Sequence, residues 1–87
     1  MNENELREAV SRALITVAPE AQPGSIDPDG NLREQLDIDS LDFLTFVIAL
    51  KKETAIDVPE SDYAEIATFN GCVSYLTKAT ATATGPS

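Results

Sequence analysis

The sequence contains no histidine, so it lacks the side chain that most often serves as a general base or a metal ligand. It has a single cysteine, which excludes a disulfide bond within the chain. No apolar run is long enough to span a membrane, so stable membrane insertion is not expected. The amino-terminal residues are acidic and polar, unlike a secretory signal or a transit peptide, and we expect a cytoplasmic protein. These absences disfavour an enzyme and a resident metal site.

Basic residues are also scarce. Six Lys and Arg face fifteen Asp and Glu, which gives a formal charge of −9. Between Glu20 and Glu65 there are twelve acidic residues and three basic ones, so the excess negative charge lies in the middle and later part of the chain. Such a field repels nucleic acid and attracts basic partners. The same acidity also keeps a small protein soluble, so charge alone leaves both interpretations open.

Strand signals are missing, and apolar residues recur at helical spacing instead. The 87 residues correspond to one small domain. Helices are predicted over residues 3–18, 40–53, 61–67 and 69–78, with a long connection at 19–36 that can supply one short helical turn. The prediction is an all-α domain over residues 1–78: a small four-helix bundle with a long first loop and a short third helix. Residues 79–87 are low in complexity and are predicted to form a disordered tail.

Three of the predicted helices begin at recognisable caps. Asn2 followed by Glu5 can form a capping box, and Asp39 followed by Asp42 is a variant of it. Thr68 can cap the last helix.

The helix over residues 40–53 is too apolar for a single core. At about 100° per residue, its apolar side chains form two faces. The inner face comprises Phe43, Phe46, Val47 and Leu50. The second face, here called the outer strip, comprises Leu41, Leu44 and Ile48. A domain of this size cannot bury both faces, so we expect the outer strip to be partly exposed and flanked by Asp37, Asp39 and Asp42. The alternative is that the first loop covers Leu41 and Ile48.

Ser40 opens this helix, where unpaired N–H groups and the positive end of the helix dipole favour negative charge. A phosphoryl group esterified to its hydroxyl would be well tolerated there. The same position also suits an ordinary polar residue in a first turn, so geometry alone does not decide between the two.

The segment Asp39-Ser40-Leu41-Asp42 resembles the Asp-Ser-Leu signature of acyl carrier proteins. The surrounding chain follows the family pattern without a gap from Leu36 to Leu76, including the Val58-Pro59 step. The resemblance covers roughly residues 3–78. It implies that Ser40 carries a covalent 4′-phosphopantetheine arm derived from coenzyme A, on which acyl groups are held as thioesters.

The resemblance further implies a phosphoprotein that acts as a monomeric carrier without catalysis of its own. Its expected partners are a phosphopantetheinyl transferase and the acyl-activating, condensing and acyl-transfer enzymes of fatty-acid, specialised lipid or polyketide biosynthesis. Such partners present basic docking surfaces. The docking face predicted for this chain consists of Asp37, Asp39, Leu41, Asp42, Leu44 and Ile48.

Two departures from the family pattern narrow this interpretation. The family usually has a glycine and a small residue before Asp-Ser-Leu, where this chain has Asp37 and Ile38. The end of the second long helix is commonly acidic in fatty-acid carriers, where this chain has Lys51 and Lys52. The lysines suggest a carrier dedicated to one pathway. The alternatives are an aminoacyl or peptidyl carrier, whose usual glycines are missing here, and a carrier-like interaction module that never receives an arm, against which an intact Ser40 counts.

Two other features do not predict functional sites. The segment 27–31 hints at a calcium loop, but its glycine stands at the fourth rather than the sixth position, so an EF-hand is rejected. Cys72 lies on an apolar stripe, which favours a buried structural cysteine over a reactive thiol.

Overall fold

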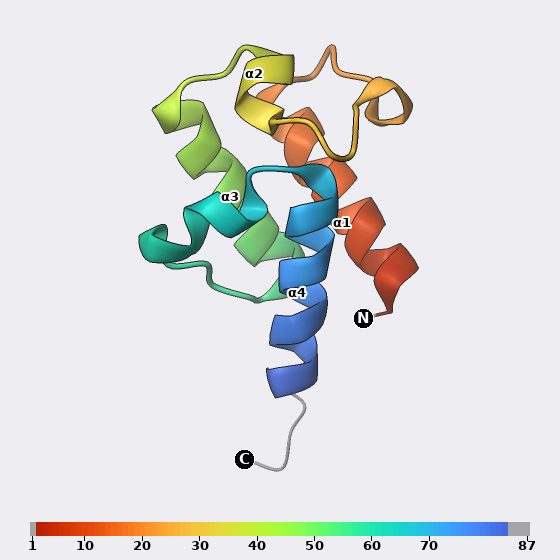
Figure 1. The fold of residues 1–87 in the computed structure, drawn as a ribbon, viewed down its shortest axis with the longest axis vertical. Helices are drawn as coiled ribbons and strands as arrows, with labels where there is room; N and C mark the ends of the chain where they lie inside the picture. The colour runs from red at the N-terminus through yellow and green to blue at the C-terminus, as the bar shows by residue number, and fades with distance from the viewer. Residues whose placement is uncertain (1, 84–87) are drawn as a thin grey trace.

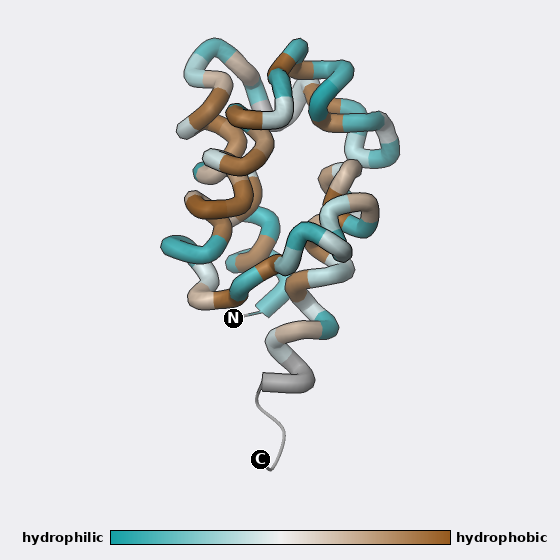
Figure 2. Tube along the Cα trace, turned by 90° about the vertical axis from the view of Figure 1, so that its left-hand side faces the viewer, coloured by the Kyte–Doolittle hydropathy of each residue, from teal (hydrophilic) through white to brown (hydrophobic). Residues whose placement is uncertain are grey.

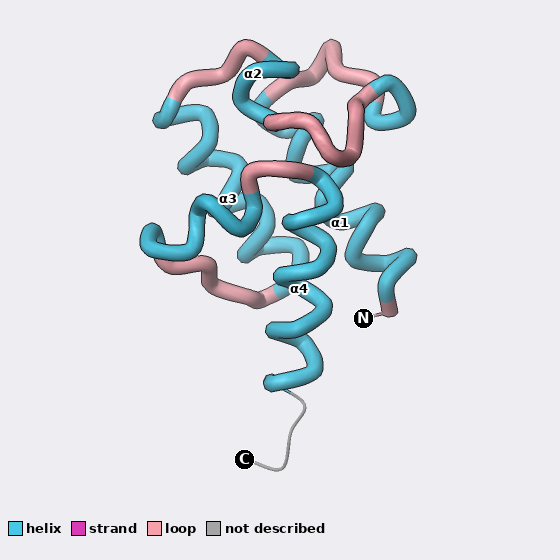
Figure 3. Tube along the Cα trace, viewed as in Figure 1, coloured by secondary structure: helices cyan, strands magenta, loops and turns pink. Residues whose placement is uncertain are grey.

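The structure, a computed structural model, describes residues 2–83 (Figure 1). The helices follow in the order α1 (Glu3–Val17), η1 (Pro23–Ser25), α2 (Leu32–Leu36), α3 (Ser40–Thr54), η2 (Glu60–Ile66) and α4 (Phe69–Ala83), where η denotes a 3-10 helix. Figure 3 shows helices and loops only, and no β-strand occurs within the described residues. The predicted all-α fold is confirmed, with a 3-10 helix as its short third helix. None of the helices described has both the length and the apolarity of a membrane span.

The first helix starts as its capping box predicts. The Asn2 side chain accepts a hydrogen bond from the Glu5 amide, and the Glu5 carboxylate accepts one from the Asn2 amide, both at 2.8 Å. One stripe of α1 is buried in the core, and it consists of Leu6, Ala9, Val10, Ala13 and Leu14. The helix ends at Val17, two residues before Pro19, which cannot continue it.

The core lies between the three long helices α1, α3 and α4, with η2 packed beside α4 (Figure 1). Its large side chains are fully buried, among them Leu14, Phe46, Leu50, Ile66 and Leu76. No polar or charged residue of the described chain is buried. Burial of apolar surface therefore holds the bundle together.

The long first loop is fastened to the junction between η2 and α4. The Leu32 amide donates to the Ala67 carbonyl at 2.8 Å, and the Asn70 amide donates to the Pro28 carbonyl at 2.9 Å. The Asn70 side chain also donates to the Asp29 carboxylate at 2.8 Å. These bonds, together with the buried Leu32 side chain, fix α2 across one end of the bundle and so fix the chain that leads into α3.

The last helix is longer than predicted. It continues through Ala83, whereas the sequence predicted an end near Lys78 and a disordered tail over residues 79–87. Alanine has the highest helix propensity, and no helix breaker occurs after Lys78 until Gly85. The helix therefore extends over residues 79–83, and residues 84–87 lie outside the part of the chain that the structure describes.

The short helix η2 is held against α4 by a side-chain hydrogen bond and by a close backbone approach. The Tyr75 hydroxyl donates to the Asp62 carboxylate at 2.7 Å. This bond, with a smaller contribution from burial, raises the pKa of Tyr75 to about 12. A Cβ atom at Gly71 would lie 2.6 Å from the Glu65 carbonyl oxygen, so glycine permits the contact.

The helix α3 ends at a left-handed residue that is not glycine. Ala55 has a φ of 60°. Its amide donates to the Lys51 carbonyl at 2.7 Å, which closes the last turn. Only glycine adopts this conformation without steric cost, and the Ala55 side chain is exposed, so it contributes little packing in return.

We predict that Ala55→Gly raises the free energy of unfolding by about 1 kcal/mol, because it removes the Cβ atom from a left-handed backbone. The thermal midpoint should rise by about 4–8 °C, as measured by circular dichroism. The control Ala49→Gly lies within α3, where glycine should lower stability by a similar amount. A lower midpoint for Ala55→Gly would contradict the prediction.

The Tyr75–Asp62 bond predicts a pH dependence of stability. The pKa of Tyr75 is about 12 in the folded chain, whereas a tyrosine in the unfolded chain has a pKa of about 10. The unfolded state therefore binds fewer protons in this window, and the contribution of the bond is present below about pH 10 and lost as the pH rises toward 12. Urea unfolding should show wild type more stable than Tyr75→Phe at pH 8, with the difference shrinking above pH 10. A stability difference between the two proteins that stays constant with pH would contradict this explanation.

Candidate functional site

Ser40 is the first residue of α3, and its side chain is exposed. The preceding residue, Asp39, caps the helix: its carboxylate accepts a hydrogen bond from the Asp42 amide at 2.9 Å. The predicted N-cap is confirmed, although the Asp42 carboxylate accepts no reciprocal hydrogen bond from the Asp39 amide. The Ser40 hydroxyl therefore stands in solvent at the positive end of a four-turn helix.

The turn before Ser40 is a left-handed cap at the end of α2. Asp37 has a φ of 53°, and the amides of Asp37 and Ile38 both donate to the Arg33 carbonyl. The acyl-carrier pattern usually has glycine at this position, and glycine is the residue that adopts a positive φ without steric cost. Aspartate is among the few other residues that tolerate this conformation. Aspartate at position 37 therefore allows the same turn as glycine and adds a carboxylate beside Ser40.

The side chain of Arg33 approaches Ser40 across this turn. Its Nη2 atom lies 3.5 Å from the Ser40 Oγ, which is a long and weak hydrogen bond. Sequence reasoning missed Arg33 as a site residue. The available signal was charge, because Arg33 is the only basic residue between positions 20 and 50.

A hollow of about 360 Å³ adjoins Ser40 between α3 and η2. The residues that line it are Arg33, Ser40, Leu41, Phe43, Leu44, Glu60 and Tyr63. The Tyr63 ring lies edge-on to the Phe43 ring, with centroids 5.6 Å apart. An exposed hydroxyl beside a partly apolar hollow leaves room for a covalent group at this end of α3, so these residues fit a phosphopantetheine arm. Glu60 and Tyr63 were also missed, because only the tertiary fold brings η2 to this position.

The outer strip is exposed, as the sequence predicts. The exposed fractions are 73% for Leu41, 44% for Leu44 and 49% for Ile48. The alternative in which the first loop covers Leu41 and Ile48 is therefore wrong. Figure 2 shows α3 as an apolar helix over most of its length. Its inner face is packed into the core, with Phe43, Phe46, Val47 and Leu50 all buried.

Acidic residues lie at the first turn of α3 and lysines at its last turn. Asp37, Asp39 and Asp42 are exposed around its first turn, whereas Lys51 and Lys52 are exposed in its last turn. Lys52 is twelve positions after Ser40, which corresponds to about 18 Å along the axis. Lys51 also lies 3.9 Å from the Asp57 carboxylate, an exposed pair that contributes little. The outer strip therefore runs from an acidic end to a basic one.

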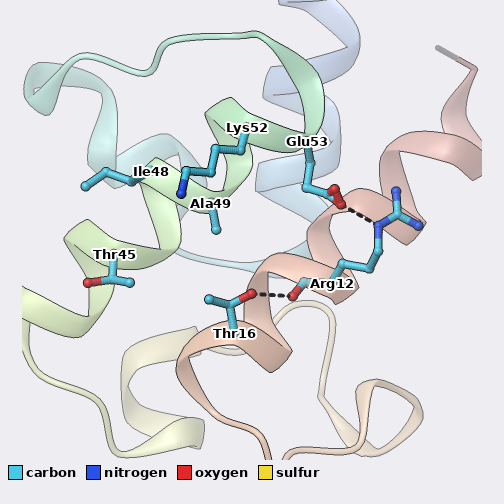
Figure 4. A pocket seen from close by; sticks show the side chains of 7 residues that line it. All are labelled: Arg12, Thr16, Thr45, Ile48, Ala49, Lys52 and Glu53. Carbon is cyan, nitrogen blue, oxygen red and sulfur yellow. Dashed lines mark hydrogen bonds and ion pairs between the residues drawn. The ribbon is translucent and has the colours of Figure 1, made fainter.

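A groove of about 430 Å³ between α1 and α3 borders the basic end of the outer strip (Figure 4). An ion pair between Arg12 and Glu53 joins the two helices on one side of it. The Thr16 hydroxyl donates to the Arg12 carbonyl of its own helix. Ile48 and Lys52 stand on the opposite side in Figure 4, so the groove continues the outer strip toward α1.

Cys72 is fully buried in α4, as its apolar stripe predicts. Burial raises the pKa of the Cys72 thiol to about 12, so it stays protonated and unreactive at neutral pH.

Among residues 2–83, no three acidic, cysteine or histidine side chains gather as metal ligands. In the segment that resembled a calcium loop, Asp27 accepts the Asp29 amide at 3.0 Å and Asp29 accepts the Asn70 side chain. These carboxylates hold the loop in place.

Comparison with known proteins places this sequence in a family. Residues 4–76 match the family described as the phosphopantetheine attachment site. The chain is 30% identical over 76 residues to the acyl carrier protein of Lactobacillus acidophilus, covering 87% of this chain and 94% of that protein. It is 25% identical over 76 residues to the acyl carrier protein of Thermosynechococcus vestitus, covering 87% of this chain and 93% of that one.

A third relative is a mitochondrial acyl carrier protein of Schizosaccharomyces pombe, 34% identical over 56 residues. That match covers 64% of this chain and half of the relative's length. The family match extends over most of the described residues and includes Ser40 with the turn before it. The chain therefore belongs to the acyl carrier protein family, whose members bear phosphopantetheine and act as carriers rather than enzymes.

Proposed function

We propose that Ser40 is the attachment point of the phosphopantetheine arm, and that the chain uses the arm to present acyl thioesters to partner enzymes. The observation that carries the proposal is the exposed Ser40 hydroxyl at the start of α3, within the segment that matches the attachment-site family. The adjoining hollow leaves space for the arm. The helix end favours the negative charge of a phosphodiester.

The protein's own contribution to the chemistry is positioning. A tether keeps the acyl group at a high effective concentration near whichever enzyme has docked. In this proposal the transferase that loads the arm supplies the base and the metal, and this chain supplies the Ser40 hydroxyl. The carrier has to be bound, used and released, so each docking contact needs to be weak and fast.

The proposed docking face is the outer strip with its acidic border. It comprises Asp37, Asp39, Leu41, Asp42, Leu44 and Ile48. All six side chains are exposed; Asp37 and Asp39 precede Ser40, and the other four follow it on α3. An apolar strip rimmed by carboxylates suits a partner that has an apolar groove with basic residues around it. The proposed partners are the phosphopantetheinyl transferase and acyl-activating, condensing and acyl-transfer enzymes.

The basic end of α3 favours a carrier dedicated to one pathway of specialised lipid or polyketide biosynthesis. Lys51 and Lys52 would repel an enzyme that selects carriers by continuous negative charge along this helix. We also propose a monomer. A cytoplasmic location is a proposal as well, since one relative is named as mitochondrial.

The attachment point is tested by loading. Wild-type protein incubated with coenzyme A and a broad-specificity transferase should gain the mass of one phosphopantetheine, measured on the intact chain. Ser40→Ala should fold normally, since the side chain is exposed, and should gain no mass. Ser61→Ala, at another exposed serine, should load like wild type. If wild type gains no mass, the chain is an interaction module without an arm. If Ser40→Ala gains mass, the attachment point lies elsewhere.

The role of the basic end is tested with Lys52→Glu and an acyl-transfer enzyme that serves general fatty-acid carriers. Reversing the charge should lower KM for the loaded carrier by about threefold to fivefold, which corresponds to the weak interaction of exposed charges, and should leave kcat unchanged. Arg7→Glu makes the same change of charge on α1, near Phe69 and away from the outer strip, and should have little effect. Equal KM values for wild type and Lys52→Glu would refute this explanation of the lysines.

A further inference from the structure

We propose that Arg33 binds the phosphate of the arm and holds it against the start of α3. The inference rests on the proposed attachment at Ser40 and adds a positioning residue to it. Arg33 lies in α2, on the far side of the turn that leads into α3.

The backbone fixes Arg33 relative to Ser40. The Arg33 carbonyl accepts the amides of both Asp37 and Ile38, so the end of α2 and the turn form one hydrogen-bonded unit. The adjacent Leu32 side chain is fully buried, and its amide donates to the Ala67 carbonyl. The base of the Arg33 side chain is therefore anchored, although its guanidinium is exposed.

The side chain of Arg33 already points at the attachment atom. Its Nη2 lies 3.5 Å from the Ser40 Oγ, and Arg33 makes no ion pair within the described residues. A phosphorus atom bonded to this oxygen would place its unesterified oxygens within reach of the guanidinium. Arginine binds phosphate through two parallel N–H donors, so the approach seen with the bare hydroxyl would become a charge-assisted contact.

The negative charge around Ser40 makes a contact between Arg33 and the phosphate important. Three exposed carboxylates, Asp37, Asp39 and Asp42, stand around the first turn of α3, and each repels the phosphodiester. Arg33 is the only basic residue between positions 20 and 50, and Lys52 is about 18 Å along the helix. The N–H groups at the start of α3 provide the second source of positive potential. Arg33 and these N–H groups together offset the repulsion, so the negative docking face and the negatively charged arm can occupy the same end of α3.

The experiment compares loaded and unloaded forms of wild type, Arg33→Gln and Arg33→Lys. Intact mass first establishes that each variant is loaded. The thermal midpoint is then measured with and without the arm, and the phosphorus-31 resonance is recorded for the loaded forms. Loading should raise the midpoint of wild type by about 2–4 °C more than that of Arg33→Gln, as expected for an exposed ion pair in a chain of this size. The phosphorus line of loaded Arg33→Gln should narrow and move toward that of free phosphopantetheine.

Two further measurements separate a phosphate contact from a general charge effect. Arg33→Lys keeps the charge and should retain part of the midpoint difference. Lys51→Gln removes one positive charge at the other end of α3 and should behave like wild type. Equal loading effects in wild type and Arg33→Gln, with unchanged phosphorus spectra, would overturn the role of Arg33 alone. Failure of wild type to load would instead overturn the attachment at Ser40, and this inference with it.

Discussion

An 87-residue chain can cover only one face of a helix as apolar as α3. The inner face is buried in the bundle through Phe46 and Leu50, and these contacts hold α3 against α1. The outer strip lies on the opposite face. The first loop cannot cover it, because that loop is fastened to the junction of η2 and α4. The exposed outer strip is thus a direct consequence of domain size and loop attachment. In the proposed docking, a partner enzyme would cover this strip.

The amino-terminal end of α3 depends on a second constraint, which is the left-handed turn at Asp37. This turn joins two short hydrogen-bonded caps, one at the end of α2 and one at Asp39, with Ser40 directly after them. The hydroxyl is therefore exposed on a rigid support rather than on a free loop. If the arm is attached at Ser40, as proposed, this support fixes the point from which it starts.

Much of this arrangement was predictable from local patterns. Apolar spacing located the four main helices, and the caps at Asn2, Asp39 and Thr68 marked their starts. The segment around Ser40 indicated the family, and the match over residues 4–76 agrees with it.

The remaining features depend on tertiary contacts or on weak local preferences. The hollow near Ser40 forms only when η2 packs against α3, and the approach of Arg33 to Ser40 follows from the left-handed turn at Asp37. The extension of α4 reflects the high helix propensity of alanine, in a segment where the sequence had suggested only low complexity.

The burial of Cys72, together with the absence of histidine, has a further consequence for an acyl thioester. A surface thiolate would offer the acyl group a second sulfur by exchange, and a nearby imidazole would promote its hydrolysis. Because the one cysteine of this chain is enclosed in the core and the chain has no histidine, neither type of side chain can attack a thioester on the arm.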